Sequence, residues 1–110
     1  MRIKLDKENS NLIKENNTYT VIDNNDLENL VVSKTILHPQ KETTGHAHEG
    51  QEEVYHFLSG NGRMQIGIVE HDVKGGDILS IPDAAFHKVW NENTKEDLIF
   101  ICVFDGRRSH

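Results

Sequence analysis

The stretch HAHEGQEEVYHFLSG, residues 46–60, decides how the rest of the chain is interpreted. Side chains alternate between the two faces of a strand, so His46 and His48 can point to the same side. Glu53 follows after a short turn-prone interval, and residues 54–58 carry β-branched, aromatic and aliphatic side chains typical of a strand. Two imidazoles and a carboxylate converging from neighbouring strands would form a set of metal ligands.

A further candidate ligand lies downstream, on a second strand-like segment at residues 86–90. The isolated His87 of this segment completes a mononuclear site. Glu52 is a competing carboxylate, but the alternation of the following strand favours Glu53. The predicted metal ligands are His46, His48, Glu53 and His87.

Composition limits the class of protein. A chain of 110 residues with 35% hydrophobic residues is one domain with a modest core. A net charge of −6 argues against a nucleic-acid partner, and no apolar run approaches the length that spans a membrane. Residues 1–6 are too charged for a signal peptide, and the single Cys102 excludes an intrachain disulfide, so we expect a cytoplasmic protein.

Short strand-like segments follow one another along the chain, separated by turns that contain glycine, asparagine or proline. This pattern predicts an all-β sandwich or barrel. The last strand, residues 98–104, is apolar at every position, so both of its faces should be covered. We divide the chain into an N-terminal arm with a first short strand (1–29), a barrel (30–104) and a polar C-terminal tail (105–110).

Two segments of the chain resemble the two motifs of the cupin superfamily. The first motif places His-x-His, a glutamate and a glycine at fixed offsets, and His46, His48, Glu53 and Gly60 match it. The second places a glycine, a proline, a histidine and an asparagine at fixed offsets, and Gly76, Pro82, His87 and Asn91 match it. The chain departs from the motifs at two turn glycines, which are Gln40 and Ala84 here.

The resemblance implies a double-stranded β-helix, or jelly roll, with a metal at its inner end. Alternation then turns Tyr55 and Phe57 inward and leaves Val54, Leu58 and Trp90 outside. Because a monomer seldom exposes so much apolar surface, we expect a homodimer packed sheet to sheet.

Three imidazoles and one carboxylate suit Fe, Mn, Ni, Co, Cu or Zn better than Ca or Mg. The leading interpretation is a dioxygenase-type enzyme acting on a small organic molecule. Its pocket would be lined by Tyr55, Phe57, Met64, Ile66 and Val89, and Tyr55 is the candidate catalytic residue.

Two alternatives stay open. One is a Lewis-acid isomerase or lyase acting on a sugar or sugar phosphate, because residues 41–48 are similar to the stretch around the metal in cupin-type archaeal glucose-6-phosphate isomerases. The other is a cupin that binds a small molecule without turnover. Arg107 and Arg108 are weaker candidates for contact with an anionic substrate.

Overall fold

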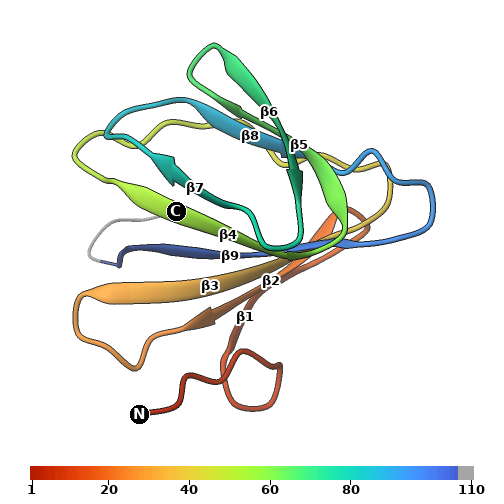
Figure 1. Ribbon diagram of the computed structural model, residues 1–110. Helices are drawn as coiled ribbons and strands as arrows, with labels where there is room; N and C mark the ends of the chain where they lie inside the picture. The colour runs from red at the N-terminus through yellow and green to blue at the C-terminus, as the bar shows by residue number, and fades with distance from the viewer. Residues whose placement is uncertain (107–110) are drawn as a thin grey trace.

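The computed structural model describes residues 1–106, which form strands, turns and loops and no helix (Figure 1). Within that range nothing forms a helix long and apolar enough to cross a membrane. The strands are β1 (Asn11–Glu15), β2 (Tyr19–Asn24), β3 (Leu30–Leu37), β4 (Glu53–Ser59), β5 (Asn61–Ile66), β6 (Val69–Lys74), β7 (Ile78–Ile81), β8 (His87–Trp90) and β9 (Leu98–Asp105).

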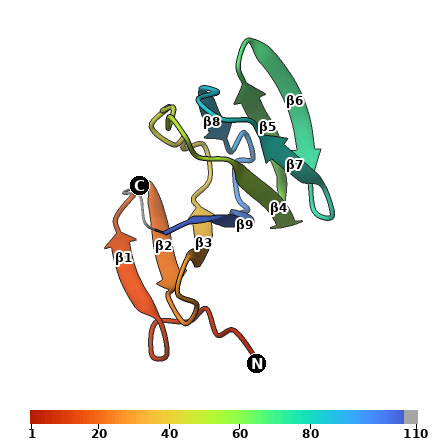
Figure 2. The same ribbon diagram turned by 90° about the vertical axis from the view of Figure 1, so that its left-hand side faces the viewer.

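The strands form two antiparallel sheets that face each other (Figures 1 and 2). One has six strands in the order β1-β2-β3-β9-β4-β7, and the other has three in the order β6-β5-β8. β9 pairs with β3 along one edge and with β4 along the other, although these three strands are distant in sequence. The predicted all-β jelly roll is confirmed.

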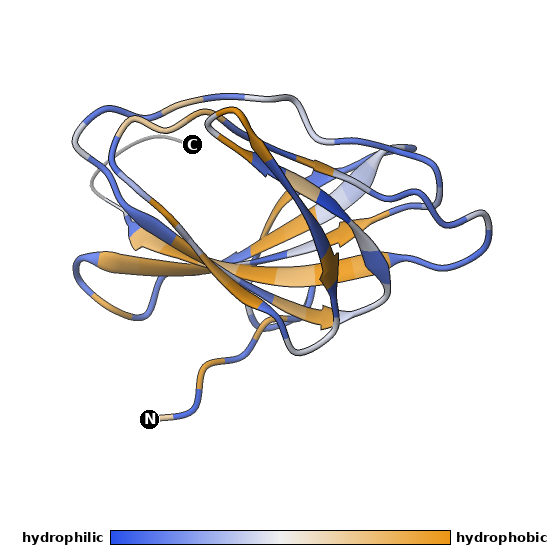
Figure 3. Ribbon diagram, turned by 45° about the horizontal axis from the view of Figure 1, so that its top comes forward, coloured by the Kyte–Doolittle hydropathy of each residue, from blue (hydrophilic) through white to orange (hydrophobic). Residues whose placement is uncertain are grey.

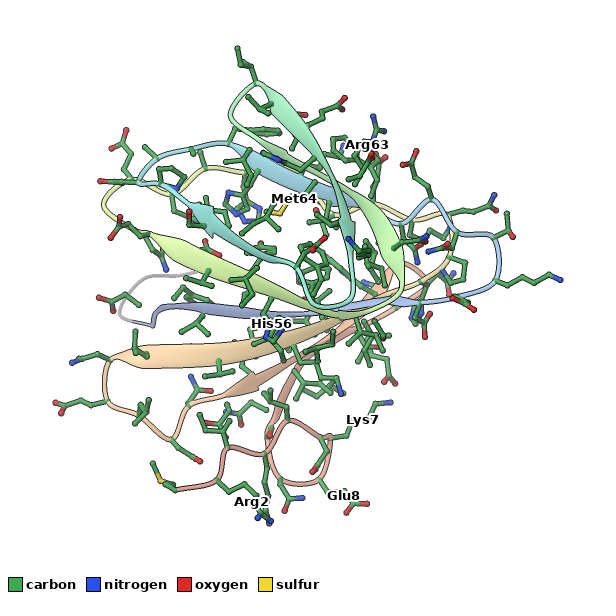
Figure 4. The ribbon with its side chains drawn as sticks, viewed as in Figure 1. Arg2, Lys7, Glu8, His56, Arg63 and Met64 are labelled. Carbon is green, nitrogen blue, oxygen red and sulfur yellow. The ribbon has the colours of Figure 1, made fainter. Side chains whose placement is uncertain are left out.

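The core fills the space between the two sheets. Phe57, Phe100 and Leu98 come from the six-stranded sheet, and Met64 and Val89 come from the three-stranded one; all are buried. Figure 3 shows hydrophobic residues concentrated along the strands, and Figure 4 shows Met64 pointing into the interior while Arg63 lies toward the outside. Burial of each of the larger side chains contributes about 1.5–3 kcal/mol to folding.

The N-terminal part of the chain joins the sheet. Residues up to Asn17 could be interpreted from sequence as a loose arm or an edge segment, and the structure makes β1 the edge strand of a hairpin with β2. β2 in turn pairs with β3 along its whole length. The side-chain amide of Asn24 donates to the carbonyl of Lys4 at 3.1 Å, which holds the segment before β1 against the sheet.

Gly60 is the point at which the chain passes from one sheet to the other. The run Gly60-Asn61-Gly62 is a sequence signal that predicts a hairpin turn, but this prediction is wrong, because β4 and β5 belong to different sheets. Gly60 has φ +87°, and a Cβ there would lie 2.5 Å from the carbonyl oxygen of Asp97. Only glycine allows this change of direction at such close backbone approach.

The two departures from the cupin motifs have a backbone consequence. Gln40 and Ala84 adopt φ values of +61° and +62°, and they are the only non-glycine residues with positive φ among those described. Side chains with a Cβ pay a steric cost of about 1–2 kcal/mol in this left-handed region. The strain therefore lies at the two positions where the motif has glycine.

Ala84→Gly is expected to raise the free energy of unfolding by about 1 kcal/mol. Relief of the strain stabilises the folded state, and this gain exceeds the stabilisation of the unfolded chain by the greater conformational entropy of glycine. Urea unfolding followed by the fluorescence of Trp90 measures the change. Ala85→Gly is the matched control, since Ala85 does not have positive φ, and it should lower stability. Equal effects of the two variants would contradict the prediction.

Candidate metal centre

The structure brings His46, His48, Glu53 and His87 together. One potential ligand atom from each lies within 4.8 Å of the others. The ring centroids of His46 and His87 are 4.4 Å apart, and those of His46 and His48 are 4.6 Å apart. The four predicted ligands thus form one cluster, and this group could hold a metal ion.

Backbone pairing positions the histidines. The sequence predicts a regular strand at His46 and His48, but the structure shows only an isolated bridge between His46 and His87. The amide of His46 donates to the carbonyl of His87 at 3.2 Å, and the amide of His87 donates back at 2.9 Å. The carbonyl of His48 accepts from the amide of Ala84 at 3.0 Å. The loop that carries the first two histidines is thereby held against the segment that carries the third.

Carbonyl groups orient two of the rings. Nδ1 of His46 lies 3.1 Å from the carbonyl oxygen of Thr44, and Nδ1 of His87 lies 3.0 Å from that of Ala85. A carbonyl can only accept, so each Nδ1 carries the proton and donates it. The lone pair is then on Nε2, which is the arrangement that histidine ligands of metals commonly use.

The carboxylate of the cluster is Glu53 and not its neighbour. Glu53 is buried on the inner face of β4, whereas Glu52 is exposed. Its Oε1 is 3.7 Å from Nε2 of His87, and that nitrogen is buried without a hydrogen-bond partner among the residues the structure describes. A buried nitrogen with its lone pair directed at a carboxylate fits a metal between them, and the set of three imidazoles and one carboxylate suits a transition metal.

Asp83 fixes the connection between His48 and Glu53. Its Oδ1 accepts from the amide of Gly50 and, at 3.2 Å, from the amide of Gln51. In the sequence, Asp83 follows Pro82 and is typical of a turn. Asp83 lies four residues before the motif histidine His87, but only the fold shows which amides its carboxylate reaches.

Burial lowers the pKa of His87 below its usual 6.5, although the hydrogen bond to Ala85 opposes the shift. The neutral ring, which a metal requires, is therefore favoured at neutral pH. His87 therefore binds a proton less readily in the folded state than in the unfolded chain. The stability that the neutral ring contributes is present above pH 6.5, the ordinary pKa, and is lost as the pH falls from there through the lowered pKa of the folded state.

We accordingly expect the metal-free protein to lose stability as pH falls below 6.5, and His87→Gln to show a shallower loss over the same range. Urea unfolding at several pH values measures both slopes, and His71→Gln, at an exposed position, is the control. Parallel slopes for the wild type and His87→Gln would contradict this expectation.

A cavity of about 330 Å³ opens beside the cluster. His46, His48 and Glu53 line it on one side, together with Tyr55. Burial, with nearby Cys102 and Glu53 adding to the effect, raises the pKa of the Tyr55 phenol well above its usual value of 10.0, so the phenol keeps its proton. A cavity of this size accommodates a small organic molecule.

The cavity wall differs from the predicted pocket. Of the five predicted lining residues only Tyr55 borders it, because Phe57, Met64 and Val89 are packed in the core. Most residues of the wall are not among those predicted, and Arg107 and Arg108 lie outside the described residues. The unpredicted lining residues include Ile13, Lys14, Tyr19, Val21, Ser33, Thr35, Thr43, Thr44 and Gln51.

Residues 33–104 match the cupin domain family, so the chain belongs to that family. The matched range contains all four residues of the cluster. The family and the cluster together define the class as a small cupin with a possible metal site.

Among curated proteins, the chain is 34% identical over 74 residues to an uncharacterized protein of Methanocaldococcus jannaschii. The alignment covers 67% of this chain and 53% of the relative, so the chain spans about half the length of the curated relative it matches.

Two solved structures show the same fold. KdgF from Halomonas sp. superimposes with a TM-score of 0.79 at 14% identity, covering 96% of this chain and 94% of that one. A proposed sugar phosphate isomerase from Acidithiobacillus ferrooxidans has a TM-score of 0.68 at 25% identity, covering 78% of this chain and 59% of that one.

Proposed function

We propose that this cupin is a metal-dependent enzyme acting on a small polar organic molecule. The observation that carries the proposal is the convergence of four potential ligand atoms within 4.8 Å at the wall of a cavity of about 330 Å³. His46, His48, Glu53 and His87 would hold the ion. A bound transition metal would supply Lewis-acid polarisation of a substrate oxygen or, if redox active, oxygen chemistry.

The residues of the chain would bind and orient the substrate. Ser33, Thr35, Thr43 and Thr44 give the cavity hydroxyl groups, and Phe100 and Phe104 give it an apolar wall. The phenol of Tyr55 holds a proton on the same wall, stacked on Phe100 with ring centroids 5.3 Å apart. Its side chain is hydrogen-bonded to that of Cys102, so Tyr55 would donate to a substrate oxygen by exchanging this partner.

The first experiment is metal analysis of protein purified without a histidine tag or a chelator. We expect about one equivalent of Fe, Mn, Ni, Co, Cu or Zn in the wild type and little in His48→Ala. His56→Ala is the matched control, because His56 lies on the opposite face of β4 from Glu53 and should leave the metal content unchanged. Wild-type protein that contains no metal and takes none up on titration would refute the proposal.

Two reaction classes remain, and each has a supporting observation. The set of three imidazoles and one carboxylate is compatible with a redox metal and therefore with a dioxygenase-type reaction. The resemblance to the proposed sugar phosphate isomerase, at 25% identity, favours a Lewis-acid isomerase or lyase. Consumption of oxygen during turnover of a substrate would identify the dioxygenase-type reaction. Uptake of deuterium from the solvent into the substrate would identify the isomerase or lyase. Binding without either would leave a non-catalytic cupin.

We also propose a homodimer formed through the outer face of the six-stranded sheet. Across this face the pairing places Val32, Val103 and Val54 in one row. Ile78 and Leu58 on the same face are 65% and 45% exposed. The row formed by Val32, Val103 and Val54 contains no carboxylate. Two copies could therefore meet there without bringing their negative charges together. Trp90 is not part of it, because Arg63 covers its ring at 4.6 Å on the other sheet.

Light scattering should give twice the mass of 12.6 kDa for the wild type and a single mass for Ile101→Lys, which places a charge at the middle of the face. Ile68→Lys is the matched control, since Ile68 is 97% exposed and lies outside this sheet. A monomeric wild type would refute the dimer.

We further infer a cytoplasmic location from the single, buried, free Cys102, which cell fractionation would test.

A further inference from the structure

Lys14 reaches the cavity because β1 contains a bulge. Leu12 pairs with Ile22 and Lys14 pairs with Val21, so Ile13 is an extra residue on β1. A bulge redirects side chains locally, and here both Ile13 and Lys14 line the cavity. Lys14 also belongs to the inner row of the sheet, since its partner Val21 pairs with Thr35, another cavity residue.

Lys14 is the one lysine or arginine among the described residues that line the cavity, and Glu53 is the one carboxylate. The two are separated by the three strands β2, β3 and β9. No ion pair joins Lys14 to Glu53 in the described part of the chain, so the charge of Lys14 is available to a ligand in the cavity they share. Within residues 1–106 Lys14 takes part in no ion pair, and its Nζ lies 5.7 Å from the centroid of the Tyr19 ring.

Gln51 offers a second polar point on the wall. Its side chain is buried, and its Nε2 donates to the carbonyl of Asp105 at 3.1 Å. This bond orients the amide and makes Oε1 the remaining acceptor, which has no hydrogen-bond partner in the described part of the chain. A buried acceptor without a donor is unfavourable, because it has lost its hydrogen bonds to water. A ligand hydroxyl in the cavity would supply that donor.

We propose that the cavity selects a small hydroxylated organic anion, whose carboxylate or phosphate pairs with Lys14 while a hydroxyl donates to Gln51. Its other end would lie at the cluster formed by His46, His48 and Glu53. The inference rests on the proposed function for the role of the metal, but the selection of an anion is a property of Lys14 itself. Lys14 is thus a specificity-determining residue contributed by the N-terminal hairpin, outside the range that matches the cupin family.

The test uses pairs of probes that share a 2-hydroxy acid head and differ in the distal group. 2-Hydroxyglutarate is compared with 2-hydroxypentanoate for a carboxylate, and 3-phosphoglycerate with glycerate for a phosphate. Binding to the protein is measured by calorimetry with and without Co²⁺, and uptake of Co²⁺ is measured separately by its visible absorption. Failure to take up Co²⁺ would count against the proposed function, whereas the ratio of affinities within a pair reports on Lys14.

We expect the wild type to bind the anionic member of at least one pair about tenfold more tightly than its neutral-tailed partner. Lys14→Met should abolish this preference and leave the affinity for the neutral-tailed member unchanged, and Lys14→Arg should retain it. Lys95→Met removes the same charge at an exposed loop position and should behave as the wild type. Equal binding within both pairs, no binding of any probe, or an unchanged preference in Lys14→Met would overturn the proposal.

The role of Gln51 is separated from that of Lys14 by Gln51→Met. This variant should lower the affinity for both members of a pair by the same factor, several-fold, and should leave the preference between them unchanged. A thermal melt followed by Trp90 fluorescence checks that the variant is folded. An unchanged affinity in the folded variant would remove Gln51 from the site.

Discussion

Replacing Glu53 by glutamine is expected to lower the affinity for a transition metal at least about a hundredfold. Even the loss of a residue that only hydrogen-bonds to a metal ligand lowers the affinity for the metal about 10–100-fold. The substitution keeps the size of the side chain and removes the negative charge. Glu53 is 8% exposed, and burial of an ionised carboxylate is costly without a cation nearby. The metal-free variant should therefore be at least as stable as the wild type, which separates a lost ligand from a lost fold.

Glu52→Gln is the matched control for this prediction. Glu52 is adjacent in sequence, carries the same charge and is exposed immediately before the start of β4. Its replacement should change the affinity by no more than about twofold, as expected for an exposed charge. Both affinities can be measured by competition with a chromophoric chelator. Equal losses in the two variants would assign the effect to net charge, and no loss in Glu53→Gln would exclude Glu53 as a ligand.

The candidate ligands are predictable from sequence because their signal is local. His46 and His48 are two residues apart, and Glu53 begins a strand whose alternation turns it inward with Tyr55. His87 is distant from the others in sequence and is predicted through the second motif, and in the structure it reaches them through an isolated antiparallel bridge with His46. The sequence also shows that Gln40 and Ala84 replace glycines of the motifs, but it does not show that both residues have positive φ values.

The cavity wall is not predictable from alternation alone. Met64 and Val89 do point inward, yet inward residues at that end fill the core instead of bordering the cavity. Lys14 lies in a polar segment whose irregular pairing has no sequence signature, because a bulge shifts the register by one residue. Ser33 and Thr35 alternate with Val32 and Lys34 on β3, and this inward polar pair was the available signal for a polar cavity.

The second large effect is expected at Asn91, the last residue of the second motif. Asn91 is 2% exposed, and its Nδ2 donates to the carbonyls of Leu37 at 2.9 Å and Glu96 at 2.8 Å. Its Oδ1 accepts from the backbone amide and the side-chain amide of Asn93, both at 3.0 Å. This one amide therefore links the end of β3 to the loop that leads into β9.

Asn91→Ala should lower the free energy of unfolding by roughly 2–4 kcal/mol, because it leaves two carbonyls without their donor and opens a small cavity. Asn91→Asp keeps an acceptor for Asn93 but turns oxygen atoms toward the carbonyls of Leu37 and Glu96, so it should not rescue stability. Asn11→Ala, at an exposed position, should change stability by less than about 0.5 kcal/mol. Urea unfolding monitored at Trp90 measures all three. If Asn91→Ala matched Asn11→Ala, the amide would contribute no net stability, and the motif asparagine would need a role other than joining these segments.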